Sequence, residues 1–272
     1  MLKHIGSFFS RIKERFDWVK DVSVHMAANP LSKTKLFLGG IWFILNDTWK
    51  SKLSFTATVS YFGRSSLFYF DDLSDYGLFC EIFIDSPYSP EKYEDVSTIF
   101  DLGANVGVSA LYFRLLYPDA HIHSFEPDPA NVEQLKQNAK YLGDITIHEN
   151  AVGGENGEIS FYVDPHRGSS SSTQKLRDRQ QEIKVETKTL DSLLEELSLD
   201  EIDILKFDIE GSEEKVFTGF SSYDKIRLLF GEIHGDLCDA DATVSILKNN
   251  YRNIQLYPLD IDDRWYIRAH NL

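Results

Sequence analysis

The pattern of apolar and polar positions predicts regular secondary structure from residue 98 onward, where short apolar runs alternate with stretches of helical periodicity. The apolar runs predict strands at Thr98–Asp101, His121–Glu126, Ile145–Val152, Ile202–Asp208, Leu228–His234, Asn253–Leu259 and Trp265–Ala269. The amphipathic stretches predict helices at Val106–Leu116, Pro129–Leu142, Leu190–Leu197, Ser212–Phe220 and Asp241–Asn250. Such alternation indicates an α/β fold, a doubly wound and mainly parallel sheet with helices on both faces.

A polar insert interrupts this alternation in the middle of the region. Two further β-like runs, Glu158–Val163 and Ile183–Thr187, bracket it. Its serine run at 168–173 predicts a loop, and its place near the edge of the predicted sheet leaves a role as a lid open.

The first 95 residues follow a different pattern. Residues 1–20 carry one apolar stripe at helical spacing, with more basic than acidic residues on the other faces. Such a helix packs on its own domain, on a partner subunit or on a membrane surface, and we favour the first. Residues 31–97 are rich in aromatics and predict short strands and helices. A break near Ser89-Pro90-Glu91 divides the chain into an N-terminal subdomain, 1–95, and a second domain, 96–272.

Composition narrows the class of protein. The chain has 272 residues, 42% of them hydrophobic, and a net charge of -15, which argues against binding nucleic acid. Cys80 and Cys238 form no C-x-x-C motif, so we expect a reducing compartment and no thiolate metal site. No run reaches the ~18–20 apolar residues of a membrane span, and no signal-peptide pattern is seen, so a cytoplasmic protein is expected. The sequence does not indicate the oligomeric state.

A loop with two glycines, "DLGANVG", follows the first predicted strand. Ligands of doubly wound sheets bind beyond the carboxyl ends of the strands, and a glycine there lets the backbone approach them closely. The spacing has one glycine fewer than the dinucleotide fingerprint. The Asp101 carboxylate would repel a pyrophosphate, but it suits a ligand that carries an amino group and a sulfonium. The candidate cofactor-binding residues of this loop are Asp101, Gly103, Ala104, Asn105 and Gly107.

Two later strand ends add candidates for the same site. Glu126, followed by Pro127, ends the second strand, where an acidic side chain accepts hydrogen bonds from the hydroxyls of an adenosine ribose. At the end of the third strand, Ala151 leaves room for an adenine ring and Asn150 is placed to read its edge. Core packing explains Ala151 and Val152 almost as well. The three strand ends together predict a site for an adenosine-containing cofactor.

Five strings in this order, "FDLGANVG", "FEPDP", "NAVGG", "LKFDIEGSE" and "GEIH", resemble the FkbM family of S-adenosylmethionine-dependent O-methyltransferases. The resemblance covers roughly residues 96–236. It implies a seven-stranded sheet with the last strand antiparallel, in the order 3-2-1-4-5-7-6. It also implies methyl transfer from S-adenosylmethionine to a hydroxyl, often of a sugar or another secondary metabolite. Residues 1–95 match no motif of the family, so they leave the choice of substrate open.

Polar side chains gather where the fourth and fifth strands end. Asp208 and Glu210 follow one strand, and Glu232 and His234 end the next, so all four reach the same rim of the sheet. Methyl transfer to a hydroxyl needs alignment and removal of a proton. We expect Asp208 to lie closest to the methyl group and to hold the cofactor or the acceptor. We expect His234 to be the general base, because the pKa of imidazole is nearest neutrality. Glu210 and Glu232 orient that imidazole, bind sugar hydroxyls or act as the base themselves; a purely structural role is the alternative for Glu210 and His234.

We expect the other polar residues near this rim to have structural roles. We expect Glu213 and Glu214 to support helix initiation, with Ser212 as the N-cap, and Lys206 to pair with a carboxylate. A divalent ion such as Mg²⁺ is possible here but not favoured, so no metal ligand is assigned.

The leading prediction is thus an O-methyltransferase that acts on a small-molecule or saccharide acceptor. Two alternatives stay open. An NAD(P)-dependent oxidoreductase shares the sheet and the ribose-binding acid, but the missing glycine and Asp101 count against it. A non-catalytic cofactor-binding scaffold in a glycan-assembly complex would leave the acidic rim without a role. Peripheral membrane association through residues 1–20 is possible in either case.

Overall fold

The computed structural model describes residues 2–45, 52–85, 88, 93–164, 172–259 and 263–271. The N-terminal part contains α1 (Leu2–His25), α2 (Pro30–Leu45), β1 (Lys52–Tyr61), β2 (Arg64–Asp72), α3 (Leu73–Cys80) and a π-helical turn, η1 (Glu81–Asp85). The remainder contains β3 (Thr98–Leu102), α4 (Val108–Leu116), β4 (His121–Phe125), α5 (Pro129–Ala139), β5 (Ile145–His148), β6 (Ala151–Val152), β7 (Gly157–Val163), β8 (Gln181–Lys188), α6 (Leu190–Glu196), β9 (Ile202–Phe207), α7 (Glu213–Gly219), η2 (Tyr223–Lys225), β10 (Ile226–His234), α8 (Ala240–Asn250), β11 (Asn253–Pro258) and β12 (Arg264–His270).

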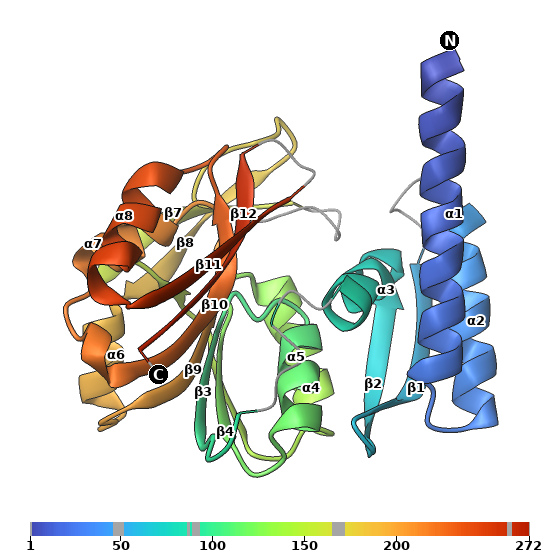
Figure 1. Cartoon of the computed structure of the whole chain (residues 1–272), viewed down its shortest axis with the longest axis horizontal. Helices are drawn as coiled ribbons and strands as arrows, with labels where there is room; N and C mark the ends of the chain where they lie inside the picture. Colours follow the sequence, from blue (N-terminus) through green and yellow to red (C-terminus); the bar gives the residue numbers. More distant parts are fainter. Residues whose placement is uncertain are drawn as a thin grey trace.

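A seven-stranded sheet organises the second part, with the order β11-β12-β10-β9-β3-β4-β5. Only β12 runs against its neighbours β10 and β11; the pairs from β10 to β5 are parallel. Numbered along the chain, these strands stand in the order 3-2-1-4-5-7-6, which confirms the predicted architecture. Helices α6, α7 and α8 cover one face and α4 and α5 the other (Figure 1). Strand β9 lies at the centre and is buried along its whole length, as expected for a parallel strand with helices on both faces.

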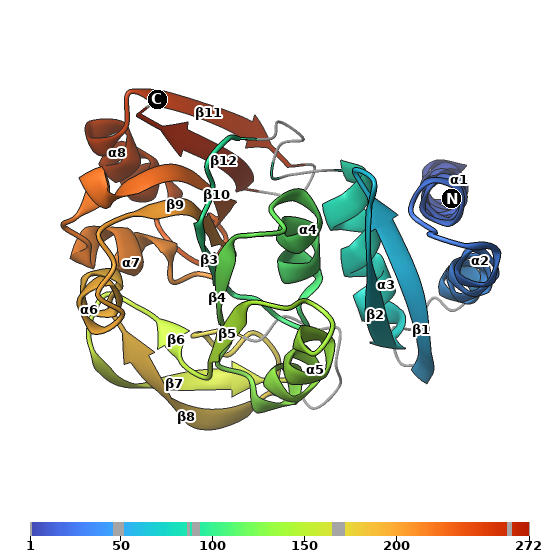
Figure 2. The ribbon, with the colours of Figure 1, turned by 90° about the horizontal axis from the view of Figure 1, so that it is seen from below.

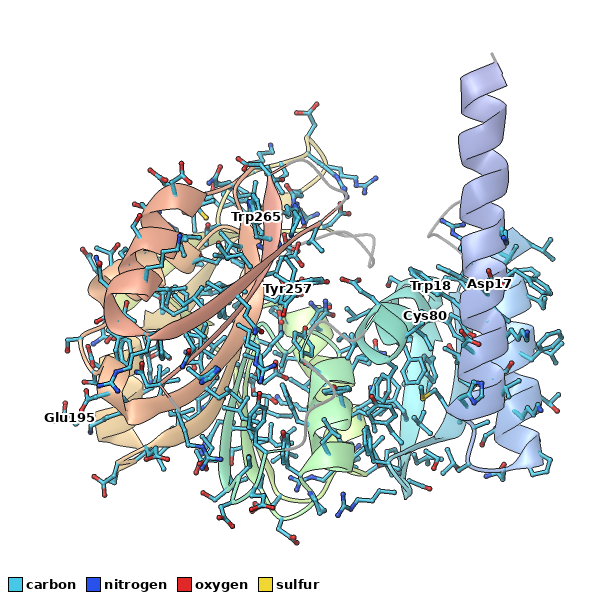
Figure 3. The ribbon with its side chains drawn as sticks, viewed as in Figure 1. Asp17, Trp18, Cys80, Glu195, Tyr257 and Trp265 are labelled. Carbon is cyan, nitrogen blue, oxygen red and sulfur yellow. The ribbon has the colours of Figure 1, made fainter. Side chains whose placement is uncertain are left out.

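The N-terminal part forms additional layers on the α4 side of the sheet. Helices α1 and α2 lie on the outer side of the β1–β2 hairpin and α4 lies on its inner side, whereas α3 contacts α1, α2 and α4 (Figure 2). One hydrophobic cluster runs from Val19 through Phe68 and Phe79 to Tyr112, and Trp18 packs against it (Figure 3). The two parts of the chain therefore share one core.

The predicted division at residues 95/96 stays a prediction, because the break proposed at 89–91 lies outside the described residues. The side chains of residues 2–12 and most of the serine run also lie outside the described residues. Membrane association through residues 1–20 and a lid role for the serine run therefore stay predictions. None of the helices in the described ranges is long and apolar enough to cross a membrane.

One predicted strand was wrong. Ile145–Val152 divides into β5, at the edge of the main sheet, and β6, which pairs with β8 in a separate three-stranded sheet. The last main-sheet bond joins the Glu126 N–H to the His148 carbonyl, and Ala151 then pairs with Thr187. The predicted strand ran across the polar residues His148, Glu149 and Asn150, which stand where the chain changes its pairing partner.

Candidate active site

The loop after β3 is held against two neighbouring strands. The N–H groups of Gly103 and Ala104 both donate to the Phe125 carbonyl, at 3.0 Å each. Gly103 has a φ of 75°, and a Cβ there would overlap the carbonyl oxygen of Asp208. Gly107, with a φ of 94°, begins α4 and lies so close to Leu135 that a Cβ would approach its side chain to 2.8 Å. Both glycines are thus required by backbone conformation and close packing, and the loop crosses directly over the end of β9.

Glu126 joins this loop to the end of β4. Its Oε2 accepts from the Asn105 N–H at 2.8 Å, and its Oε1 accepts from the Asp128 N–H at 2.9 Å and from Asn131 Nδ2 at 3.4 Å. Burial raises the pKa of Glu126 to about 7, although these hydrogen bonds oppose the shift. The predicted ribose-binding acid therefore lies beside the predicted cofactor loop, and Pro127 directly follows it.

Asp101 lies beneath the loop rather than facing outward. Its side chain is fully buried, its Oδ1 is 3.2 Å from Lys206 Nζ, and its Oδ2 accepts from Ser109 Oγ at 2.6 Å. Lys206 Nζ also donates to the carbonyls of Leu102 at 3.2 Å and Gly103 at 2.7 Å. The expected pairing of Lys206 with a carboxylate is confirmed. The negative charge of Asp101 is balanced inside the protein, so this residue supports the loop from below instead of presenting a carboxylate to a ligand.

The candidates after β5 serve mainly the fold. Asn150 is buried and its Nδ2 donates to the Ala151 carbonyl at 2.8 Å. Ala151 packs with Phe161 and Val185 in the core of the small sheet. Val152 belongs to the hydrophobic cluster between the main sheet and its outer helices. The side chains of Ala151 and Val152 are therefore explained by packing, and the reading of an adenine edge by Asn150 stays a prediction.

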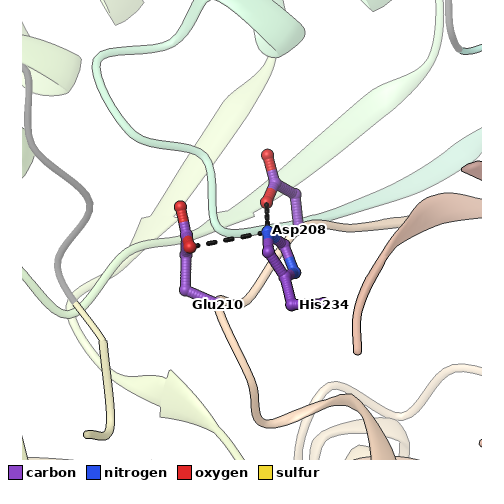
Figure 4. A group of neighbouring side chains, drawn as sticks. All are labelled: Asp208, Glu210 and His234. Atoms are coloured by element: carbon purple, nitrogen blue, oxygen red, sulfur yellow. Dashed lines mark ion pairs between the residues drawn. The ribbon is translucent and has the colours of Figure 1, made fainter. Parts of the chain in front are cut away.

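The ends of β9 and β10 bring together the four predicted catalytic residues. His234 Nε2 lies 3.4 Å from Glu210 Oε2, 3.6 Å from Glu232 Oε1 and 3.7 Å from Asp208 Oδ1. Asp208, Glu210 and His234 converge on one point, each with a potential ligand atom within 4.8 Å of the others (Figure 4). Asp208 lies directly beside the cofactor loop, because its N–H donates to the Leu102 carbonyl at 3.1 Å.

The environment of His234 does not favour the role of general base, which stays a prediction. The imidazole is 1% exposed, and its Nδ1 is 2.7 Å from Oε1 of the fully buried Glu213. Burial acts to lower the pKa of His234, but the hydrogen bond and charge of Glu213, with the charges of Asp208 and Glu210, outweigh it and raise the pKa to about 10. These contacts favour the protonated imidazole, which has no free lone pair to accept a proton from a hydroxyl.

Glu232 is the second candidate for the group that accepts the proton. Burial and the negative charge of Asp208 raise its pKa to about 8, and Glu81 adds to the effect, whereas His234 and Arg264 oppose it. Below that pH the carboxyl is protonated; above it, the ionised carboxylate is a stronger base than an ordinary one. This role is among those predicted for Glu232 from the sequence.

Strand β12 supplies two site residues that the sequence analysis missed. In the antiparallel pairing with β10, Arg264 stands opposite His234 and Tyr266 stands opposite Glu232. Arg264 Nη1 lies 3.5 Å from Glu232 Oε1. The strand order implied by the family resemblance already placed β12 beside β10. That order, together with the register of the two strands, could have predicted Arg264 and Tyr266 at this rim.

Two further residues were missed for different reasons. Glu213 was assigned to helix initiation, but it is the hydrogen-bond partner of His234, and Ser212 makes no side-chain capping bond. Glu81 comes from η1 in the N-terminal part and accepts from Tyr266 Oη at 2.9 Å. The N-terminal part therefore reaches the active-site rim, and no motif within residues 1–95 signals this.

Comparison with known proteins identifies the family of this site. Residues 101–253 match the model of the methyltransferase FkbM domain. The chain is 30% identical to the 2-O-methyltransferase NoeI of Sinorhizobium fredii, over 49% of this chain and 62% of that protein. It is 28% identical to the 31-O-demethyl-FK506 methyltransferase FkbM of Streptomyces tacrolimicus, over 58% of this chain and 74% of that one. It is 24% identical to the hexuronic acid methyltransferase AglP of Haloferax volcanii, over 65% and 72%. Since the domain match covers more than half of its residues, the chain belongs to the FkbM methyltransferase family.

Proposed function

We propose that this methyltransferase moves the methyl group of S-adenosylmethionine to a hydroxyl of a saccharide or a related small molecule. The observation that carries the proposal is the contact of Glu126 with the glycine loop, at the end of the strand next to β3. The buried Glu126 carboxylate can accept hydrogen bonds from ribose hydroxyls, and it lies beside a loop whose glycines let a ligand approach the backbone. This arrangement fits an adenosine-containing cofactor. The names of NoeI and FkbM support transfer to oxygen, and that of AglP supports a sugar acid as acceptor.

The chain's own residues divide the work at this site. S-adenosylmethionine, when bound, supplies an electrophilic methyl carbon. The loop from Gly103 to Gly107 and the Glu126 carboxylate hold the adenosine end. Asp208 stands where that loop meets the acidic rim and orients the acceptor. Glu232, once ionised above its raised pKa, takes the proton of the acceptor hydroxyl. A dinucleotide fits less well, because its pyrophosphate would lie at a loop that adjoins Asp208.

Transfer of a labelled methyl group tests the proposal. The full chain is incubated with S-adenosylmethionine that carries a trideuterated methyl, together with a panel of saccharides that includes hexuronic acids. Mass spectrometry is expected to show one labelled methyl on a hydroxyl of at least one saccharide. Transfer only to nitrogen or carbon acceptors would contradict the assignment.

Replacing Glu126 with glutamine is expected to weaken S-adenosylhomocysteine binding by about 10–100-fold, since a hydrogen bond to a charged group contributes ~1.5–3 kcal/mol. Isothermal titration calorimetry measures the change. Glu133→Gln, an exposed acid on the adjacent helix α5, serves as the matched control and should bind like the unmodified chain. Equal affinity in the Glu126 variant would remove the ribose-binding role.

Binding of S-adenosylhomocysteine should also tighten as the pH rises from 6 to 8. Burial raises the pKa of Glu126 to about 7, and ribose hydroxyls donate to the ionised form, so binding must release a proton below that pKa. We expect an increase of up to about tenfold, since affinity falls by this factor for each pH unit below the pKa. The Glu126→Gln variant should show a flat profile. Affinity that declines with rising pH would show that the protonated acid binds.

A further inference from the structure

We propose that His234, Asp208 and Glu210 form a site for one divalent cation of the Mg²⁺/Mn²⁺ class, held in place by Glu213. The sequence alone did not favour a metal here, but the side-chain geometry does. The catalytic meaning of this site rests on the proposed O-methyl transfer, whereas the site itself rests on the contacts below.

The first observation is the spacing of the donor atoms. One ligand atom from each of the three residues lies within 4.8 Å of the others, and His234 Nε2 is 3.4 Å from Glu210 Oε2 and 3.7 Å from Asp208 Oδ1. Around an octahedral Mg²⁺ with bonds of about 2.1 Å, adjacent donors stand about 3 Å apart and opposite donors about 4 Å apart. The three atoms surround a common point at separations that a small closure would bring to these values (Figure 4).

The second observation is the buried imidazole that faces this point. His234 is 1% exposed, and its Nδ1 is fixed by Glu213 Oε1 at 2.7 Å, with Glu213 fully buried. Its Nε2 makes no hydrogen bond to any described residue and lies among carboxylate oxygens instead. A histidine held at one nitrogen by a carboxylate, with the other aimed at acidic side chains, is the usual arrangement of a metal ligand.

The chemistry of the donors limits the choice of cation. Two carboxylates and one imidazole offer mostly hard oxygen ligands, which suit Mg²⁺ and Mn²⁺ better than a soft thiolate-binding ion. Two negative charges balance one divalent cation. Asp208 and Glu210 are partly exposed, so the site keeps an open side toward the rim. A hydroxyl of the acceptor that coordinates there would have a lowered pKa, which makes transfer of its proton to Glu232 easier.

Manganese binding tests the site without reference to catalysis. The full chain is stripped with EDTA, dialysed and titrated with Mn²⁺, and free Mn²⁺ is followed by electron paramagnetic resonance. We expect one equivalent to bind. Asp208→Asn and His234→Gln should each lose at least tenfold in affinity, and Glu213→Gln should lose about 10–100-fold, as outer-sphere partners of metal ligands do. Asp241→Asn, an exposed acid on α8, is the control and should bind normally.

Other outcomes separate this inference from the proposed function. If a His234 variant does not fold, judged by circular dichroism, Glu210→Gln gives the same test at a partly exposed position. No binding at millimolar Mn²⁺, or wild-type binding by Asp208→Asn, overturns the metal site. Full methyl transfer in EDTA also overturns it while leaving the proposed function intact. Mn²⁺ binding at these residues without binding of S-adenosylhomocysteine supports the metal site and contradicts the proposed function.

Discussion

Replacing Lys206 with methionine is expected to lower the free energy of unfolding by about 3–5 kcal/mol, because the buried carboxylate of Asp101 then loses its counter-charge. Both side chains are at most 2% exposed, and they lie 3.2 Å apart at the centre of the sheet. For a chain of this size the loss corresponds to a fall in Tm of roughly 6–20 °C, measured by calorimetry or thermal denaturation. The variant also loses the lysine's hydrogen bonds to the Leu102 and Gly103 carbonyls, so S-adenosylhomocysteine should bind more weakly.

A second substitution distinguishes charge from packing as the cause. Asp101→Asn removes the uncompensated charge and keeps an oxygen for the hydrogen bond from Ser109. The double variant, Lys206→Met with Asp101→Asn, should therefore regain most of the lost stability. If the two variants are equally unstable, the lysine acts through its packing or its bonds to the loop, and the buried ion pair is not what stabilises this region.

Replacing Glu232 with glutamine is expected to lower kcat by about 10²–10⁴-fold, the usual contribution of a positioned general base. Affinity for S-adenosylhomocysteine should be unchanged, because Glu232 lies on β10, which β9 separates from the strand β3 that leads into the loop. Steady-state kinetics measures kcat, with the acceptor that the labelled-methyl experiment identifies. Calorimetry measures the affinity for S-adenosylhomocysteine. Glu201→Gln, an exposed acid that precedes β9, is the matched control.

The pH dependence of the same reaction supplies an independent check on the base. Burial and Asp208 raise the pKa of Glu232, so kcat should fall with decreasing pH through a range above the ordinary carboxyl value of about 4.3. In the Glu232→Gln variant, kcat should no longer fall with decreasing pH over this range. Full turnover by that variant would assign the proton to Asp208 or Glu210 instead.

The sequence predicted the sheet well because its strands are continuous apolar runs separated by clear helical periodicity. The family resemblance then supplied the strand order, which periodicity does not contain. The prediction failed at Ile145–Val152, where one strand was extended across the polar residues His148, Glu149 and Asn150 although the pairing partner changes there. The two strands also differ in burial, since β5 is half-buried and β6 is buried in the small sheet.

The site was predictable in its residue types but not in their partners. Asp208, Glu210, Glu232 and His234 were placed at one rim because the carboxyl ends of adjacent parallel strands meet there. The raised pKa of His234 depends on Glu213, whose side chain is close to it only after α7 folds back on β10. A pKa shift of this kind depends on distances between elements, and a sequence pattern does not give those distances.

If the glycine loop and Glu126 hold S-adenosylmethionine, the full chain should bind its product and not a dinucleotide. Calorimetric titration with S-adenosylhomocysteine, and separately with NADH, measures both. We expect saturable binding of S-adenosylhomocysteine with one equivalent per chain, and no heat of binding for NADH. Binding of NADH without binding of S-adenosylhomocysteine would contradict it.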